Sequence, residues 1–252
     1  MANQKPKILY LASKPLGKRI LNFLLKQKDI ELVGVCFPEP LEIPILPNDQ
    51  KLFNQLDFDL LLSVNYTERI KEPLLSKPRL GCINVHNSYN NRIRGRNCTS
   101  HAILLGRLHG VSYHGVTIHY MVSEFDSGKI IASQACTIEE NDTAKTLYDK
   151  TEALTEELIL EWFPRIWSGT IIPYLPPEPS YMFKSTSLQD KEVKAEWTPL
   201  AKYDFVRALT FPPYERPFVL REGKKVYLTI DSTEGNAVLL RIDERCIYTV
   251  NE

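Results

Sequence analysis

The sequence lacks the features that would mark a disulfide-rich, zinc-binding or membrane protein. Its cysteines are odd in number, include no C-x-x-C pair, and are Cys36, Cys82, Cys98, Cys136 and Cys246. This spacing argues against a disulfide framework and against a zinc site. No stretch approaches the roughly 20 apolar residues of a membrane-spanning helix, and the apolar run after the polar start is too short for a signal peptide. We therefore expect reduced thiols in a soluble, cytoplasmic protein with no metal and no membrane partner.

An excess of charge of one sign is also missing. Lys plus Arg equal Asp plus Glu, at 31 each among 252 residues, so the large positive field of a general nucleic-acid binder is absent. The turn at residues 13–17 lacks the G-x-G-x-x-G pattern of dinucleotide-binding folds. No G-x-S-x-G elbow of a hydrolase occurs either. Nicotinamide enzymes, α/β-hydrolases and nucleic-acid partners are therefore disfavoured.

What the sequence does contain is an alternation of short apolar runs with helical patterns. Six apolar runs predict strands, at residues 7–12, 31–37, 58–65, 80–86, 115–121 and 129–137. Helices are predicted to begin near Pro15, at an Asn48 cap and at a Thr67 cap, and a long helix runs from an Asp142 cap to a stop at Gly169. This alternation predicts an α/β fold, a Rossmann-like and mostly parallel sheet with helices on both faces.

A proline-rich stretch, Tyr174–Pro179, is the best candidate for a domain boundary. We expect a main domain over residues 1–173 and a C-terminal subdomain over residues 174–252. In the subdomain, Thr198-Pro199 predicts a helix start. Four β-like pieces follow, at residues 217–220, 224–230, 237–242 and 246–250, with turns at Gly223 and Gly235-Asn236. This small α+β, β-hairpin appendage needs a partner surface, which is either the main domain or a second copy of the chain.

Two polar residues close the fourth predicted strand. Asn84 and His86 alternate along it and therefore share one face, where an amide and an imidazole project together. Ligands of parallel sheets bind beyond the carboxyl ends of the strands, which is where His86 lies. His114 and His119 are five residues apart on a predicted strand, so they face opposite sides and make no metal pair. Structural roles are expected for His101, His109 and His119.

A run of further motifs surrounds these two residues. Gly81–Ser88 reads G-C-I-N-V-H-N-S, and an Arg-Gly pair follows eight residues after the histidine. His114–Met121 reads H-G-V-T-I-H-Y-M, and Asp126–Ile131 reads D-S-G-K-I-I. In this order the motifs resemble the folate-dependent formyltransferases, whose shared pattern is Asn-x-His-x-Ser, Arg-Gly, a Gly-Val-Thr strand and an Asp-x-Gly loop. A weaker resemblance extends from Lys7 to about Gly169.

By this resemblance, Asn84, His86 and Asp126 match the catalytic trio of the family. The implied co-substrate is N10-formyltetrahydrofolate, and no metal is needed. Attack of an amine on the formyl carbon makes a tetrahedral intermediate with an oxyanion, to which Asn84 and a protonated His86 would donate hydrogen bonds. Asp126 would orient His86 and help to pass the proton from the amine to the folate nitrogen.

The residues around the trio bear on the acceptor. Ser88-Tyr89-Asn90-Asn91 stands where many relatives have Ser-x-Leu-Pro, while Arg94–His101, His114–Thr117 and Arg207–Tyr214 look most like the nucleotide-sugar N-formyltransferases. That branch formylates dTDP- or UDP-linked amino deoxysugars for surface polysaccharide, and we expect dTDP-4-amino-4,6-dideoxyglucose as the acceptor. Residues 174–252 carry 11 Lys plus Arg against 12 Asp plus Glu, whereas a tail that grips tRNA would be basic.

A diphosphate needs cations and hydrogen-bond donors. Lys14 follows the first predicted strand, and Arg94 and Asn97 follow the strand of Asn84 and His86, so these three are the candidates. The alternative for Arg94 is to brace its own loop through backbone carbonyls. Phe211 and Tyr214 are candidates for stacking on the base, although aromatics beside Pro-Pro are more often packing residues.

Folate is expected to lie after the third strand and near the Asp126 loop. Leu62, Val64 and Met121 are the candidates to contact it, with core packing as the alternative for each. The resemblance favours a homodimer through the C-terminal region, because tail hairpins form dimer contacts in some nucleotide-sugar enzymes. Three other functions stay open: formylation of another amine, of the methionyl-tRNA or glycinamide ribonucleotide type, hydrolysis of formyltetrahydrofolate, and non-catalytic binding of a nucleotide sugar or folate.

Overall fold

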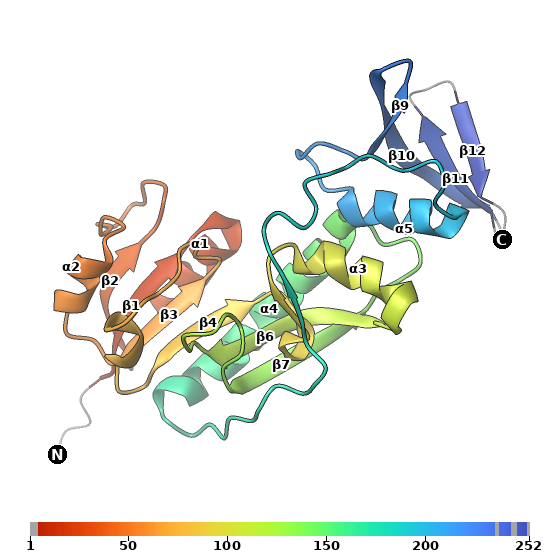
Figure 1. Cartoon of the computed structure of the whole chain (residues 1–252). Coiled ribbons are helices and arrows are strands. Elements are labelled where there is room, and N and C mark those ends of the chain that lie inside the picture. Colours follow the sequence, from red (N-terminus) through yellow and green to blue (C-terminus); the bar gives the residue numbers. More distant parts are fainter. Residues whose placement is uncertain (1–4, 235–236, 243–245, 251–252) are drawn as a thin grey trace. The chain divides into compact units, whose positions relative to one another are not determined.

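The computed structural model describes residues 5–234, 237–242 and 246–250, with side chains described as far as Ile230. The chain forms two compact units, and each collects separate stretches of sequence (Figure 1). The first unit consists of Met1–Arg94, Gly115–Gln134 and Glu152–Ser180. The second consists of Gly95–His114, Ala135–Thr151 and Tyr181–Glu252.

The last segment of the first unit ends at Ser180. The proline-rich stretch that we expected as a boundary ends at Pro179, one residue earlier. The compact units nevertheless differ from a single cut at residue 173, because two internal segments join the C-terminal residues. Hydrophobic contacts explain this. Ile103, Ala144 and Leu147 from the internal segments share one buried cluster with Ala208 and Leu209. The functional division into residues 1–173 and 174–252 stays a prediction.

The main sheet has six strands in the order β2-β1-β3-β4-β6-β7. The strands are β1 (Lys7–Ala12), β2 (Glu31–Cys36), β3 (Leu60–Val64), β4 (Cys82–His86), β6 (Tyr113–Tyr120) and β7 (Ile130–Thr137). Neighbours among the first four strands are parallel, and β6 runs antiparallel to β4. This confirms the predicted α/β, Rossmann-like sheet. Each predicted strand is present, with its ends within two residues of the expected ones.

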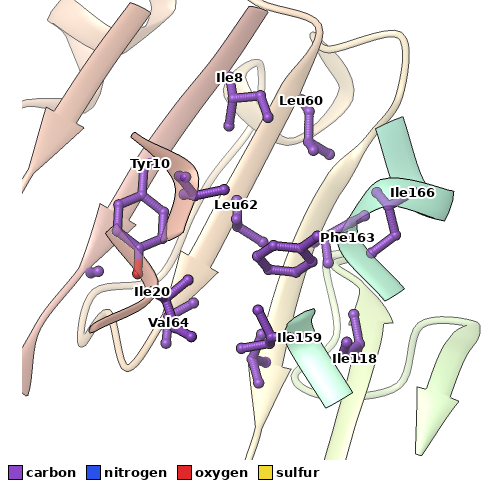
Figure 2. Close-up of a cluster of buried hydrophobic side chains, with 14 of the residues drawn as sticks. Ile8, Tyr10, Ile20, Leu60, Leu62, Val64, Ile118, Ile159, Phe163 and Ile166 are labelled. Atoms are coloured by element: carbon purple, nitrogen blue, oxygen red, sulfur yellow. The ribbon is translucent and has the colours of Figure 1, made fainter. Parts of the chain in front are cut away.

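Helices cover both faces of this sheet, as predicted. Side chains alternate along β1, so Ile8 and Tyr10 point to one face while Leu9 and Leu11 point to the other. The first face packs against α1 (Lys14–Leu24) and α4 (Ala144–Trp167). Figure 2 shows residues of α4, among them Phe163, lying against the β3 side chains in this cluster. On the second face lie α2 (Gln50–Gln55) and the 3-10 helix η1 (Leu74–Ser76).

Several helix starts differ from those predicted. Asp49, not Asn48, caps α2, because its carboxylate accepts the Lys51 backbone N–H. Thr143 accepts the Thr146 N–H at the start of α4, while the predicted cap Asp142 instead accepts from the Glu139 N–H one turn earlier. The helix predicted after Thr67 is absent. Residues 66–71 are irregular apart from one bend at Glu68, and only the three-residue η1 follows.

The second unit contains a four-stranded antiparallel sheet in the order β12-β11-β10-β9. Its strands are β9 (Phe218–Arg221), β10 (Lys224–Glu234), β11 (Ala237–Ile242) and β12 (Cys246–Val250). The four predicted β pieces are therefore confirmed, and Gly223 takes the expected turn with a φ of +75°. The turn expected at Gly235-Asn236 lies outside the described residues. Thr198 caps α5 (Pro199–Leu209) through the Ala201 N–H, as predicted.

One helix and two short strands were not predicted. Helix α3 (Cys98–His109) begins with Cys-Thr-Ser and has no acidic residue in its first turn, so the usual signals of a helix start are missing. The short strands β5 (Ile93–Gly95) and β8 (Tyr181–Phe183) pair with each other. A side chain on Gly95 would meet the Phe183 carbonyl at 2.2 Å, so this pairing requires a glycine.

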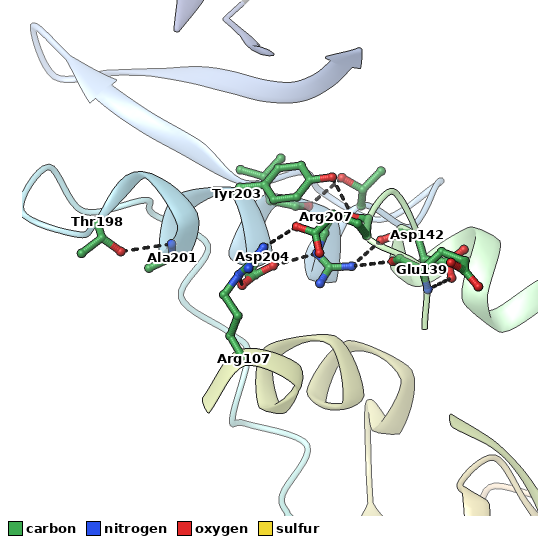
Figure 3. Close-up of polar contacts among 11 residues, drawn as sticks. Arg107, Glu139, Asp142, Thr198, Ala201, Tyr203, Asp204 and Arg207 are labelled. Carbon is green, nitrogen blue, oxygen red and sulfur yellow. Dashed lines mark hydrogen bonds and ion pairs between the residues drawn. The ribbon is translucent and has the colours of Figure 1, made fainter. Parts of the chain in front are cut away.

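A buried ionic network holds the second unit together. Asp204 on α5 accepts from Arg107 on α3 at 2.6 Å and from Arg207 at 2.8 Å (Figure 3). Arg207 is 4% exposed and also donates to the backbone carbonyls of Glu139 and Asp142, at 3.1 and 3.3 Å. One guanidinium therefore ties α5 to the segment that precedes α4.

Replacing Arg207 with Leu should lower the free energy of unfolding by about 3–5 kcal/mol, because it leaves a buried carboxylate and two carbonyls short of a donor. Urea titration measures the loss. The matched control is Arg165→Leu, whose side chain is 50% exposed in an i,i+4 pair and should cost about 0.5 kcal/mol or less. Equal losses in the two variants would show that the network contributes nothing special.

The structure also bears on two classes considered from the sequence, disulfide-rich and membrane-spanning proteins. No disulfide joins the four cysteines whose side chains are described, Cys36, Cys82, Cys98 and Cys136, and the Cys246 side chain lies outside those described. No helix within the described ranges is both long and apolar enough to cross a membrane.

Candidate active site

The site is built on the pairing of β4 with β6 in the first unit. In their register Asn84 lies opposite His119, and His86 lies opposite Thr117. Directly opposed residues of an antiparallel pair point to the same face. Two polar pairs therefore stand side by side on one face of the sheet, at the carboxyl end of β4.

Asp126 reaches this face from the loop between β6 and β7. Its Oδ2 lies 3.6 Å from His86 Nε2, and its Oδ1 lies 3.6 Å from His119 Nε2. The Asp126 side chain is 12% exposed, so the carboxylate is largely shielded from water. The structure thus brings together Asn84, His86 and Asp126, the three residues that the motif comparison singles out.

His86 is held in place by the loop that follows it. The residue is 8% exposed, and its Nε2 donates to the Ile93 carbonyl at 2.9 Å. Nε2 therefore carries a proton in this arrangement, between a carbonyl and the Asp126 carboxylate.

His119, expected to be structural, lies inside the site. It is 1% exposed, and burial lowers the pKa of its ring to about 4. Nδ1 donates to the Tyr120 carbonyl at 2.9 Å, so in the neutral ring Nε2 is an acceptor and faces the Asn84 amide nitrogen at 3.4 Å. The role of His119 follows from strand register, because His119 lies directly opposite Asn84 in the pairing of β4 with β6. Predicting that role would have required knowing that these two strands are neighbours.

The loop after His86 is fixed by hydroxyl groups. Thr117 Oγ1 donates to the Ser88 carbonyl at 2.6 Å, and Ser88 Oγ accepts the Ile93 N–H at 2.9 Å. Ser133 on β7 accepts the Asn90 N–H at 2.9 Å. These bonds carry the segment that departs from the common Ser-x-Leu-Pro pattern, and they hold the Ile93 carbonyl against His86.

Strained backbone gathers in the loops of the first unit. Residues other than glycine with left-handed φ angles occur after β1, β3, β4 and β6, and they are Lys14, Asn65, Asn90, Asn91 and Asp126. Such conformations cost about 1–3 kcal/mol each and persist where the surroundings impose them, often at functional sites. Asparagine and aspartate tolerate this region better than other residues, which suits most of these positions.

Two arginines hold the Asp126 loop. Arg94 Nη1 donates to Glu124 Oε1 at 2.8 Å, and the Arg94 side chain is 17% exposed. Arg69 donates to the Ser123 carbonyl at 2.5 Å, and its guanidinium lies 4.9 Å from the centre of the Phe125 ring. Arg94 was considered as a diphosphate ligand, with bracing of a loop as the alternative. In the structure it braces the loop through the Glu124 carboxylate and not through backbone carbonyls.

The folate candidates on β3 are core residues. Leu62 and Val64 are each 1% exposed and belong to the main hydrophobic cluster. This placement matches the core-packing alternative given for both residues, and their contact with folate stays a prediction. Both faces of the sheet are covered, so apolar side chains on both sides of β3 are buried. Met121 is half-buried against the second cluster.

The other predicted acceptor contacts are divided between the units. Lys14 is exposed in the first unit, where it is the first residue of α1. Asn97 precedes α3 in the second unit and is exposed with a left-handed φ of +56°. The centres of the Phe211 and Tyr148 rings lie 5.3 Å apart, and Phe211 packs against the cluster of Ile103 and Leu209. Packing was the alternative role given for Phe211. Tyr214 is 67% exposed. Contact with an acceptor stays a prediction for all five candidates, Lys14, Arg94, Asn97, Phe211 and Tyr214.

A search of the described side chains for groups of His, Cys, Asp and Glu that could hold a metal ion finds none. The grouped polar atoms are instead an amide, two imidazoles and a carboxylate. This set can donate hydrogen bonds to a developing oxyanion and move a proton.

The sequence is similar to formyltransferases. The formyl transferase family matches residues 45–162 of the chain. Methionyl-tRNA formyltransferase of Staphylococcus aureus (strain JH1) is 31% identical over an alignment of 189 residues, and the match covers 65% of this chain and 60% of that protein. The chain thus spans 60% of the length of this curated relative.

Three solved structures are similar to the chain. A 4-N formyltransferase from Francisella tularensis is 20% identical with a TM-score of 0.76, covering 92% of this chain and 100% of that one. PseJ from Anoxybacillus kamchatkensis, in complex with UDP-4,6-dideoxy-4-formamido-L-AltNAc and tetrahydrofolate, is 27% identical with a TM-score of 0.57, covering 71% and 86%. An N-formyltransferase from Helicobacter canadensis, in complex with folinic acid and dTDP-3-aminofucose, is 18% identical with a TM-score of 0.68, covering 96% and 98%.

Proposed function

We propose that the chain is an N-formyltransferase, in keeping with the match of the formyl transferase family to residues 45–162. It moves the formyl group of N10-formyltetrahydrofolate onto the primary amine of a nucleotide-linked amino deoxysugar. The observation that carries this proposal is the meeting of His86 and Asp126 at 3.6 Å on the face that also presents Asn84.

The reaction follows from what these groups can do. The amine nitrogen attacks the formyl carbon, and the carbonyl electrons move onto the oxygen to give an oxyanion. Asn84 and the protonated His86 donate hydrogen bonds to that oxygen, each worth about 3–4 kcal/mol in comparable sites. The bond from the formyl carbon to the folate nitrogen then breaks. The proton lost by the amine passes to that nitrogen, with Asp126 orienting His86 for the transfer.

Charge and relatives support a sugar acceptor. Residues 174–252 carry 11 basic against 12 acidic residues, which does not suit a tail that holds tRNA phosphates. Two of the similar structures contain nucleotide-linked sugars, one with dTDP and one with UDP. Both of these also contain a folate, which fits the proposed formyl donor.

Within this class we propose dTDP-4-amino-4,6-dideoxyglucose as the acceptor and surface polysaccharide as the destination of the product. A sugar formylated at the 4-amine occurs in the PseJ complex. The four described cysteines form no disulfide with one another, as suits the reducing cytoplasm where we place the reaction. Lys14 and Asn97 are proposed to contact the diphosphate, and Tyr214 the base.

A panel of acceptors tests the proposal. The purified chain is incubated with N10-formyltetrahydrofolate and, in turn, with dTDP- and UDP-linked 3-amino and 4-amino sugars, glycinamide ribonucleotide and methionyl-tRNA. Mass spectrometry then detects the formylated product. We expect kcat/KM to be highest for a dTDP-linked 4-amino sugar. A higher kcat/KM for glycinamide ribonucleotide would contradict the sugar assignment and leave the formyl transfer standing.

Methionyl-tRNA is the second candidate acceptor, because the Staphylococcus aureus enzyme of that name is 31% identical to the chain. In the same panel, formylation of methionyl-tRNA at a higher kcat/KM than any amino sugar would favour this function. Consumption of formyltetrahydrofolate with no acceptor present would instead indicate a hydrolase.

We also propose that the protein is a homodimer through its C-terminal region. The sheet of β9 to β12 ends in β12, and an edge strand offers backbone groups with which a second copy of the chain can pair. Light scattering behind size exclusion should give twice the chain mass at micromolar concentration. A chain shortened to end near Phe211 should be monomeric. A monomer at full length would rule the dimer out.

A further inference from the structure

The orientation of the Asn84 amide decides whether it can serve as an oxyanion donor. The amide must present an N–H to the formyl oxygen, since its own carbonyl oxygen would repel the developing charge. An asparagine amide has two donors on one side and an acceptor on the other, and rotation about its last side-chain bond is broad. Some group must therefore fix which side faces the reaction.

Ser63 is one neighbour of this amide. It lies on β3, directly beside Asn84 in the parallel register of β3 and β4. Ser63 Oγ donates to Asn84 Oδ1 at 2.9 Å, and the serine is 3% exposed. The carbonyl oxygen of the amide therefore faces β3, where it accepts the hydrogen bond from Ser63.

His119 is the neighbour on the other side. Its Nδ1 donates to the Tyr120 carbonyl, and its Nε2 accepts from Asn84 Nδ2 at 3.4 Å. Burial keeps this ring neutral at physiological pH, since it lowers the pKa to about 4. A reversed amide would turn its oxygen toward the Nε2 lone pair, which would be repulsive. His119 therefore selects the orientation, and the shorter bond from Ser63 anchors it.

We propose that Ser63 is a positioning residue for formyl transfer, which holds the Asn84 amide so that its second N–H points at the formyl oxygen. The proposal rests on the function proposed above and on the oxyanion role of Asn84. Ser63 itself touches no substrate. Its hydroxyl acts through Asn84 alone, and this dependence separates a positioning role from a general contribution to the sheet.

The test compares kinetics of Ser63→Ala and Ser63→Thr in the full chain, with the best acceptor of the panel. Ser63→Ala should lower kcat about five- to tenfold, because it removes one neutral hydrogen bond that helps to stabilise the transition state. KM for both substrates should stay within about twofold. Ser63→Thr keeps the hydroxyl and should stay within about threefold of the original kcat. The control is Thr155→Ala, which removes a buried hydroxyl from α4 and should leave kcat unchanged.

A double-mutant cycle with Asn84→Ala completes the test. If Ser63 acts through the amide, Ser63→Ala should cause no further loss of kcat in the Asn84→Ala background. The inference is overturned if Ser63→Ala keeps the full kcat, or if it lowers kcat equally in both backgrounds. Full activity of Asn84→Ala would overturn the role of the amide and the inference with it. Absence of transfer by the unaltered chain would overturn the proposed function as well.

Discussion

Replacing His86 or Asp126 with Asn should lower kcat by about a hundredfold or more while binding of the nucleotide sugar changes little. Both groups act mainly in the transition state, where proton transfer and oxyanion stabilisation are needed, so their loss appears in kcat. Asp126→Asn is a close match in shape and tolerates the left-handed φ of +52° found at this position. The loop should therefore survive the change, and only the charge beside His86 is lost.

Steady-state kinetics and calorimetry separate the two effects. His109→Asn is the matched control for the histidine, because His109 is an exposed residue of the second unit and should leave kcat unchanged. Thermal unfolding of each variant checks that the fold is kept. Near-normal turnover by both His86→Asn and Asp126→Asn would remove these residues from the chemistry.

Lowering the pH from 7 to 5 should destabilise the protein by about 2 kcal/mol for each of two buried histidines. Burial lowers the pKa of both His101 and His119 from 6.5 to about 4. Between these pKa values the unfolded chain binds more protons than the folded one, so stability is present above pH 6.5 and is lost as the pH falls toward 4. The slope is about 1.4 kcal/mol per pH unit for each histidine.

Urea unfolding at pH 7 and pH 5 measures this loss. In His101→Gln and His119→Gln the difference between the two pH values should shrink, whatever the variant does to stability at pH 7. His109→Gln removes an exposed histidine and should keep the original difference. The same pH dependence in all four proteins would show that neither buried ring controls it.

The fold was predictable from local pattern wherever both faces of a strand or one face of a helix are apolar. β1 is buried along almost its whole length, and the sequence there is a continuous apolar run. Helix α3 escaped prediction because its first turn lacks an acidic residue and its cap, Asn97, is left-handed with no side-chain cap bond. The discontinuity of the two units also escaped, since it depends on contacts such as Ile103 with Ala208 that no local pattern contains.

The trio of the site was predictable because its motifs keep their spacing around one strand and one loop. Ser63 and His119 were not, since their roles come from register. Each lies beside Asn84 on a neighbouring strand, and strand order cannot be taken from either residue alone. Leu62 and Val64 lie on the strand next to the site, and their side chains pack in the core. Whether they also contact folate stays a prediction.

The central claim, that formyl transfer at Asn84, His86 and Asp126 ends on an amino sugar, is tested most directly by a label. Tetrahydrofolate carrying a ¹³C-formyl group at N10 is mixed with the chain and dTDP-4-amino-4,6-dideoxyglucose, and carbon NMR follows the label. The account predicts that the formyl signal moves to a sugar formamide as fast as tetrahydrofolate appears, and that Asp126→Asn slows both together. Label that appears as free formate, or stays on the folate, would contradict it.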